Sequence, residues 1–212
     1  VGGCINVDAA GIRPGSKEGR RILFVGRNFV RKGGPLVVQA FTILRKKYLW
    51  SAELYLAGAK ESDIRDALRE RQIRVEEADW QKIHLLGDLG SEKLTDYYNL
   101  CDVFCMPSYF EAYGLVFAEA LTYGLPCIGR DKFAMSEFIE DGCTGRLISG
   151  EDAEELALDL WEVLQDPKYR EEVERRREWY LREYSWDKVA QRICSVMEKN
   201  ERDKDQYRSA GV

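Results

Sequence analysis

Short apolar runs that alternate with amphipathic helical segments constrain the fold of this sequence more than any other feature. Residues 21–25 form the first apolar run, which Gly26 closes, and residues 36–47 then carry apolar side chains at helical spacing. The order recurs with apolar runs at residues 52–57, 83–86, 103–106 and 126–129, each followed by a helical pattern. Nearly continuous apolar strands followed by helices are typical of a parallel sheet covered on both faces. We therefore predict an α/β fold with a doubly wound parallel sheet.

The two ends of the chain differ from this central pattern. Residues 1–19 are rich in glycine and poor in apolar anchors, so we predict a linker or entry segment there. Residues 20–197 are predicted to form one domain, because 212 residues with 45% apolar content can bury a single core. This domain would include an edge strand at residues 145–148 and a helical C-terminal extension from Asp152. Residues 198–212 are polar and are predicted to be a disordered tail.

Charge, hydropathy and cysteine content exclude several functions. The 37 acidic and 32 basic residues are thoroughly mixed, so no basic block indicates a nucleic-acid partner. No apolar stretch approaches the length of a membrane span, and we expect a cytoplasmic protein. The six cysteines form no C-x-x-C pair, and His84 is the only histidine, so we predict no metal site. Cys105 and Cys127 are predicted to be reduced core thiols, and His84 to pack at a strand end.

The loop from Gly26 to Gly34 follows the first predicted strand and opens a helix. It carries Arg27, Arg31 and Lys32, and a helix N-terminus already favours an anion. This combination suits a diphosphate, although a basic surface turn is an equally good interpretation of the loop alone. The loop matches neither G-x-G-x-x-G nor G-x-x-x-x-G-K-[ST], which weakens the dehydrogenase and nucleoside-triphosphatase interpretations.

The segment from Pro107 to Ala120 follows the fourth predicted strand. A helix that starts near Gly114 would direct its first N–H groups toward phosphate oxygens. These groups belong to Gly114, Leu115 and Val116. Glu111 precedes the helix and Glu119 lies one to two turns inside it, so the two carboxylates can bracket a ligand across the helix end. Taken singly, each is better read as an exposed turn residue or a helix-surface acid.

The glutamate pair, with seven residues between its members and Tyr113-Gly114 inside it, resembles the signature of a large family. This is the group of retaining GT-B glycosyltransferases that includes sucrose synthase and many bacterial polysaccharide glycosyltransferases. The resemblance covers about residues 20–197. The other segments that agree, in the same order, are Gly26-Arg27 with Lys32-Gly33, Leu86-Gly87-Asp88, residues 120–126, residues 141–145 and Tyr184-Ser185-Trp186.

The resemblance implies a Rossmann-like domain and a role for each matching residue. Arg27 and Lys32 would neutralise the donor diphosphate, and Glu119 would bind the ribose hydroxyls. Glu111 would bind the donor sugar and is the expected catalytic residue. Backbone hydrogen bonds to the diphosphate would come from Gly114, Leu115 and Val116, and base contacts from Gly87 and Leu89. Such enzymes use a nucleoside-diphosphate sugar as the donor substrate and no cofactor or metal.

The resemblance also implies a partner. A GT-B enzyme has two Rossmann-like domains, and this chain, which begins with Val1, matches only the C-terminal one. We expect it to be inactive without its N-terminal domain, to expose Trp186, and to act in polysaccharide assembly with the full-length enzyme peripheral at a membrane. Phe133 and Ala134 stand where such enzymes often carry two glycines, which puts the usual sugar contacts there in doubt.

Other functions remain open from the sequence. The same architecture is found in nucleotide-sugar epimerases and in phosphorylases. The sequence around a pyridoxal-phosphate lysine, which phosphorylases normally carry, is not recognisable here, and the glutamate pair favours a transferase over an epimerase. From a different class, the chain could be a degenerate, non-catalytic nucleotide-binding scaffold, because a fold alone proves no activity. The base, the sugar and the acceptor cannot be read from the sequence.

Overall fold

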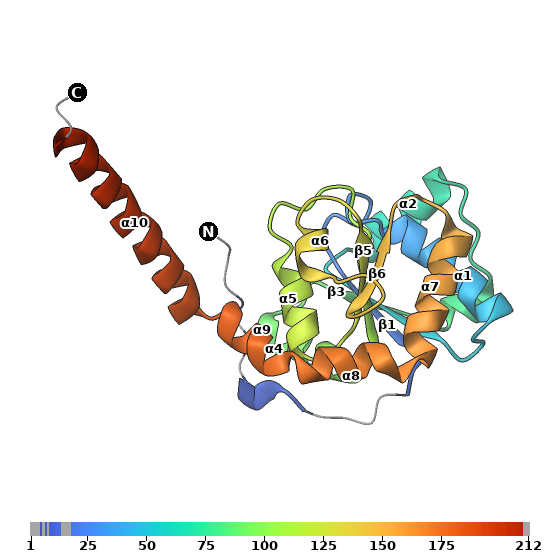
Figure 1. The fold of residues 1–212 in the computed structure, drawn as a ribbon. Coiled ribbons are helices and arrows are strands. Elements are labelled where there is room, and N and C mark those ends of the chain that lie inside the picture. Colours follow the sequence, from blue (N-terminus) through green and yellow to red (C-terminus); the bar gives the residue numbers. More distant parts are fainter. Residues whose placement is uncertain (1–4, 6, 8, 14–17, 210–212) are drawn as a thin grey trace.

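A six-stranded parallel sheet forms the centre of the molecule in a computed structural model that describes residues 5, 7, 9–13 and 18–209. The strands lie in the order β3-β2-β1-β4-β5-β6 (Figure 1). Their bounds are β1 Arg21–Val25, β2 Glu53–Ala57, β3 Ile83–Gly87, β4 Val103–Cys105, β5 Cys127–Arg130 and β6 Gly145–Ile148. This order is that of a doubly wound Rossmann-like domain, which confirms the predicted fold class.

Helices cover both faces of the sheet. α1 packs against α7 on one face, and α5 packs against α8 and α9 on the other (Figure 1). The helices that follow the first five strands are α1 Gly34–Lys47, α2 Glu61–Glu70, α3 Glu77–Trp80, α4 Ser91–Leu100, α5 Leu115–Thr122 and α6 Met135–Phe138. Those after the last strand are α7 Ala153–Gln165, α8 Pro167–Arg175, α9 Arg177–Glu183 and α10 Trp186–Ser209. Of these, α3 has no counterpart in the sequence pattern.

The ends of the late helices follow local chemistry. The Asp152 carboxylate accepts N–H bonds in the first turn of α7, as an N-cap residue does. Asp166 repeats this role for α8, whose first residue is Pro167. The Ser185 hydroxyl accepts the N–H of Lys188 at 3.2 Å and caps the first turn of α10.

The core lies between the sheet and both helix layers. The side chains of Ile22, Leu23 and Phe24 in β1 are fully buried. Cys105 and Cys127 are buried and form no disulfide, as predicted from their apolar surroundings. His84 lies in the edge strand β3 and stacks on Tyr55, with ring centroids 4.3 Å apart.

The two terminal segments lie beside each other at one side of the domain. Of the predicted linker 1–19, residues 1–4, 6, 8 and 14–17 lie outside the described residues, while Ala9–Gly11 form a short 3-10 helix. The N–H of Ile5 donates to the carbonyl of Tyr184 at 3.0 Å. α10 projects away from the domain and continues to Ser209, so helix extends into the predicted tail, of which residues 210–212 are outside the description (Figure 1). Within the described residues, no helix is long and apolar enough to cross a membrane.

Candidate functional site at the carboxyl ends of the strands

The strand order reverses between β1 and β4, and ligands of open α/β sheets bind beyond the carboxyl ends at such a switch point. The loops after these two strands touch each other. A Cβ atom on Gly33, whose φ is 79°, would lie 2.4 Å from the carbonyl oxygen of Pro107. The N–H of Tyr109 also donates to the carbonyl of Arg31 at 2.9 Å. Only glycine permits this approach at position 33, and it brings both predicted loops together at the switch point, where this fold places its ligand crevice.

Lys32 and Glu111 form an ion pair across this crevice. Both side chains are only 14% exposed, so the pair is largely withdrawn from water. Gly26 makes room for it, because a Cβ there would meet the Lys32 side chain at 2.8 Å. The structure therefore brings together the residue predicted for the diphosphate and the one predicted for the sugar.

Arg27 lies at the outer rim of the same loop. Its guanidinium donates to both carboxylate oxygens of Asp88, at 3.2 and 3.1 Å, and its side chain is 80% exposed. Gly58, which follows β2, approaches the backbone of Gly26 and Arg27 and supports the loop from below. Both predicted phosphate cations thus contact carboxylates of the protein.

The helix α5 begins at the floor of the crevice. Gly114 precedes it in the left-handed conformation, with a φ of 67°, which favours glycine. Its carbonyl accepts the N–H of Phe117 at 2.9 Å and closes the first turn. The earlier N–H groups of Leu115 and Val116 have no acceptor within a helix, since helix geometry provides none in the first turn. Their use by an anion stays a prediction.

Glu119 projects from the second turn of α5 toward α4. The Tyr98 hydroxyl donates to its Oε2 at 3.0 Å. Burial raises the pKa of the Glu119 carboxyl, and this hydrogen bond opposes the shift. A carboxylate fixed in this way can accept hydroxyl hydrogen bonds in a defined direction, which is the property that ribose binding needs.

The predicted base loop lies at the end of the edge strand β3. Gly87 closes the strand with a φ of 64°, and its carbonyl accepts the N–H of Gly58 at 2.7 Å. Leu89 is half-buried just beyond it. Both are separated from the switch point by β2, so their link to the crevice runs through the contact between Asp88 and Arg27.

Two supporting side chains were not singled out from the sequence: Tyr98, the partner of Glu119, and Arg130. Asp88 was predicted only as part of the base loop and not as the partner of Arg27. Arg130 ends β5, is buried, and donates to the carbonyls of Gly150 and Pro107 at 2.9 and 3.5 Å. Its guanidinium also lies 4.8 Å from the ring centroid of Tyr109. The sequence signal that could have identified Arg130 is its position, because it is a charged residue at the end of an otherwise apolar strand.

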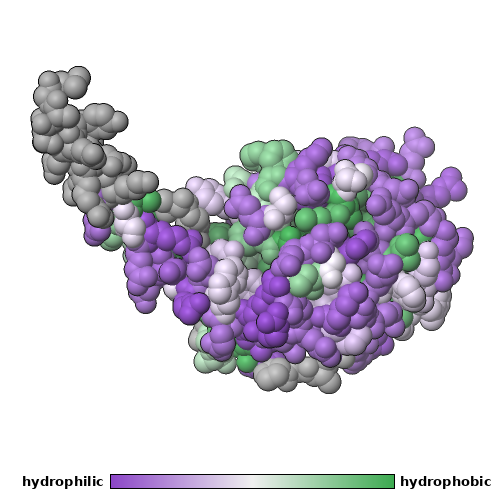
Figure 2. All heavy atoms as spheres, in the orientation of Figure 1, coloured by the Kyte–Doolittle hydropathy of each residue, from purple (hydrophilic) through white to green (hydrophobic). Residues whose placement is uncertain are grey.

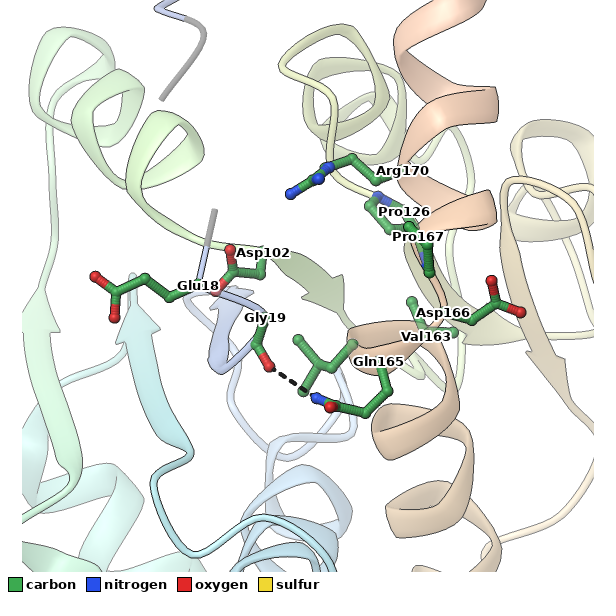
Figure 3. A pocket seen from close by; sticks show the side chains of 10 residues that line it. Glu18, Gly19, Asp102, Pro126, Val163, Gln165, Asp166, Pro167 and Arg170 are labelled. Carbon is green, nitrogen blue, oxygen red and sulfur yellow. Dashed lines mark hydrogen bonds between the residues drawn. The ribbon is translucent and has the colours of Figure 1, made fainter. Parts of the chain in front are cut away.

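A separate hollow of 280 Å³ lies at the other edge of the sheet (Figure 3). It is lined by Gly19, Asp102 and Pro126, which precede β1, β4 and β5. The Gln165 amide donates to the carbonyl of Gly19 at 3.3 Å there. This hollow is at the amino ends of the strands and is therefore not the candidate site. Among the described residues, no group of three or more His, Cys, Asp or Glu side chains is arranged to hold a metal ion.

The strand order and the switch-point crevice define the class of this protein. It is a doubly wound Rossmann-like domain of the kind found in GT-B glycosyltransferases. Residues 12–179 match the family model described as "Glycosyl transferases group 1", and the chain belongs to that family.

Curated relatives agree with this assignment. The chain is 27% identical over 185 residues to a phosphatidyl-myo-inositol mannosyltransferase of Mycolicibacterium smegmatis, covering 86% of this chain and 46% of the relative. It is 28% identical over 188 residues to a lipopolysaccharide 1,2-N-acetylglucosaminetransferase of Salmonella typhimurium, covering 86% and 49%. The chain spans about half the length of the curated relatives it matches.

Solved structures show the same fold. The pneumococcal O-GlcNAc transferase GtfA in complex with UDP and GlcNAc superimposes with a TM-score of 0.69 at 22% identity, over 86% of this chain and 36% of that one. WaaG, a glycosyltransferase involved in lipopolysaccharide biosynthesis, gives a TM-score of 0.63 at 23% identity, over 81% and 44%.

Proposed function

We propose that this chain is the donor-binding half of a retaining glycosyltransferase, which moves a sugar from a nucleoside-diphosphate sugar to an acceptor. The contact between Lys32 and Glu111 is the observation that supports it best. A cation suited to a leaving diphosphate lies there beside a carboxylate suited to sugar hydroxyls, at the switch point where domains of this fold bind ligands.

Transfer requires stabilisation of the charge that develops on the departing nucleoside diphosphate. Lys32 and Arg27 would supply two positive charges, and the N-terminus of α5 would add backbone N–H groups and its dipole. Glu111 would orient the donor sugar, and Glu119 the ribose. These groups would serve in place of a divalent cation, so donor binding is expected to be metal-independent.

A second, N-terminal domain would supply the acceptor side of the crevice. The chain spans about half of its relatives, and α9 and α10 carry exposed apolar side chains that such a domain would cover. These are Trp179, Trp186, Ile193, Val196 and Met197. We expect no sugar transfer by this chain alone, and transfer once its N-terminal half is added. Product formed with inverted anomeric configuration, seen by NMR, would contradict the retaining mechanism.

Calorimetric titration with UDP, GDP and ADP, in magnesium and again in a chelator, tests the donor site. We expect one of these nucleotides to bind equally well under both conditions, and the Lys32→Ala variant to lose that binding. Binding that needs magnesium would contradict the metal-independent mechanism. Absence of all binding would favour a degenerate scaffold that no longer binds nucleotides. In a separate incubation with a nucleotide sugar, an epimerised sugar without transfer to an acceptor would favour the epimerase.

The full-length enzyme would work at a membrane surface, as the names of relatives that act on phosphatidyl-myo-inositol and lipopolysaccharide suggest. Co-sedimentation of the two joined halves with anionic vesicles tests this. A protein that stays in the supernatant at low ionic strength would contradict it.

A further inference from the structure

Two phenylalanine side chains stand exposed at the crevice. Phe110, in the loop after β4, and Phe133, in the turn after β5, are 52% and 50% exposed. Their rings meet edge to face, with centroids 5.1 Å apart and planes at 70°. Figure 2 shows hydrophobic side chains gathered at the upper rim of the domain, over the loops that follow these two strands. Large apolar side chains that are gathered and exposed at one place mark a surface that binds something.

The backbone holds Phe133 in a costly conformation. Its φ is 58°, in the left-handed region that bulky residues rarely occupy. The Ser136 hydroxyl donates to the carbonyl of Phe133 at 3.2 Å and helps to fix the turn. Strain of this kind persists where the surrounding structure imposes it, and it is concentrated at functional sites. A glycine would fit the turn without strain, so the turn itself does not explain the phenylalanine.

The other ring is held as firmly. The carbonyl of Phe110 accepts hydrogen bonds from the Arg31 guanidinium at 2.6 Å and from the Ser108 hydroxyl at 2.9 Å. The Phe110 ring is therefore carried on the same loop contact that forms the crevice. Hydrogen bonds thus hold the backbone under both rings, and the edge-to-face contact joins the rings to each other, which lowers the entropic cost of binding.

The backbone that carries the two rings adjoins Glu111, whose carboxylate we assign to the sugar. The N–H of Ala134, the residue after Phe133, donates to the carbonyl of Glu111 at 3.3 Å. Phe110 directly precedes Glu111 in the chain. A pyranose ring has an apolar C–H face and a rim of hydroxyl groups, and an aromatic surface beside a hydrogen-bond acceptor matches both parts.

We propose that Phe110 and Phe133 form an aromatic platform, in which one ring offers its face to the apolar face of the donor's pyranose ring and the other supports it edge to face, and that Phe133 selects which sugar is accepted. The platform rests on the proposed function, because it assumes that the diphosphate lies at Lys32. It adds a contact that depends on the sugar and not on the nucleotide. Removing a ring should therefore weaken binding of the nucleotide sugar and leave binding of the bare nucleotide unchanged.

The experiment compares two affinities for each variant of the chain. UDP, GDP and ADP are titrated calorimetrically, and then UDP-glucose, UDP-N-acetylglucosamine, GDP-mannose and ADP-glucose. Phe133→Gly removes the ring and the strain together, Phe133→Ala removes the ring alone, and Phe133→Trp keeps an aromatic surface. Circular dichroism checks that each variant is folded. Trp161→Ala is the matched control, because Trp161 and Tyr48 form another exposed aromatic pair, 5.7 Å apart, away from the crevice.

The platform predicts that Phe133→Gly and Phe133→Ala bind the preferred nucleotide sugar about three- to tenfold more weakly, the range expected for one aromatic contact. Affinity for the bare nucleotide should stay within about twofold, and Phe133→Trp should restore sugar binding. Unchanged sugar affinity, or equal losses for nucleotide and nucleotide sugar, would overturn the platform alone and would point to a partner domain on the two rings. A wild-type chain that binds no nucleotide would overturn the proposed function and the platform with it.

Discussion

A charged side chain at the amino ends of the strands (the amino edge) is buried, whereas a charged pair at the carboxyl ends (the carboxyl edge) is exposed. At the amino edge, Asp102 is only 7% exposed and its Oδ2 accepts the N–H groups of Arg20 and Arg21 at 2.9 and 2.8 Å. At the carboxyl edge, Arg27 and Asp88 pair with each other while their side chains are 80% and 63% exposed. The Asp102 carboxylate accepts two backbone N–H groups that would otherwise lack an acceptor. The contact of Arg27 with Asp88 joins two side chains instead, and both are exposed to water.

The fold requires the buried charge at the amino edge more than the exposed pair at the carboxyl edge. A buried carboxylate that satisfies backbone N–H groups cannot leave without exposing unpaired donors. An exposed ion pair contributes little to stability, so its members can exchange partners when a charged ligand arrives. Lys32 and Glu111 lie between these extremes, largely buried but facing the crevice. We therefore expect changes at the amino edge to alter folding and changes at the carboxyl edge to alter binding.

Asp102→Ala should produce the largest effect. Because it leaves two backbone N–H groups without their acceptor, we expect the free energy of unfolding to fall by about 2–4 kcal/mol. Urea denaturation measures this, and the nucleotide affinity of the folded fraction should stay the same. A loss of stability below about 0.5 kcal/mol would place Asp102 with ordinary surface charges.

Lys32→Ala should produce the next largest effect, a loss of affinity for nucleoside diphosphate. A largely buried ammonium group that contacts phosphate is expected to contribute about 1.5–3 kcal/mol, so nucleoside diphosphate should bind roughly ten- to 100-fold more weakly. Calorimetric titration measures the affinity. The matched control is Lys47→Ala, which removes an exposed lysine paired with Glu154 and should leave binding unchanged.

Arg27→Ala and Asp88→Asn should have smaller and opposite effects. Removing the exposed guanidinium should weaken nucleotide binding by about fivefold, and neutralising its competitor Asp88 should strengthen it by about two- to threefold. The free energy of unfolding should change by less than about 0.5 kcal/mol in both variants. If Asp88→Asn also weakens binding, Asp88 contacts the ligand directly and does not compete with it.

Glu119→Gln should have a small effect on stability that depends on pH. Burial raises the pKa of Glu119 above its ordinary value, so the folded state holds a proton that the unfolded state has already lost. The wild-type chain therefore loses stability as pH rises from the ordinary pKa through the raised one. Glutamine keeps an acceptor for Tyr98 and cannot ionise, so the variant should gain thermal stability relative to wild type at pH 7 and not at pH 4. An equal difference at both pH values would show that ionisation of Glu119 is irrelevant.

Much of the fold could be predicted because it depends on local patterns. The apolar run at residues 21–25 matches β1, and the run at 145–148 matches β6. Buried parallel strands are recognisable because both faces need apolar side chains. The helical segment predicted from Asp152 begins with α7 at Ala153, which also follows from a local pattern. The polar helix α3 was not, because its four residues carry no apolar stripe.

The site was only partly readable. Loop sequences placed Lys32 and Glu111 at strand ends, and strand order then brought them into contact. The pairing of Arg27 with Asp88 depends on how the loops after β1 and β3 lean over β2, which no local pattern records. The contact of Tyr98 with Glu119 depends likewise on the packing of α4 beside α5. The roles of all these residues in donor binding stay predictions.

We propose that a nucleoside diphosphate binds at the carboxyl ends of β1 and β4. Amide chemical-shift mapping of this chain during titration with UDP, GDP and ADP tests this most directly, because it reports which ends of the strands bind the ligand. We expect one nucleotide to shift the amide signals of residues 26–34 and of Gly114, Leu115 and Val116, and to leave those of Gly19, Asp102 and Gln165 unmoved. Shifts confined to the hollow at the amino ends of the strands would contradict donor binding at the carboxyl ends.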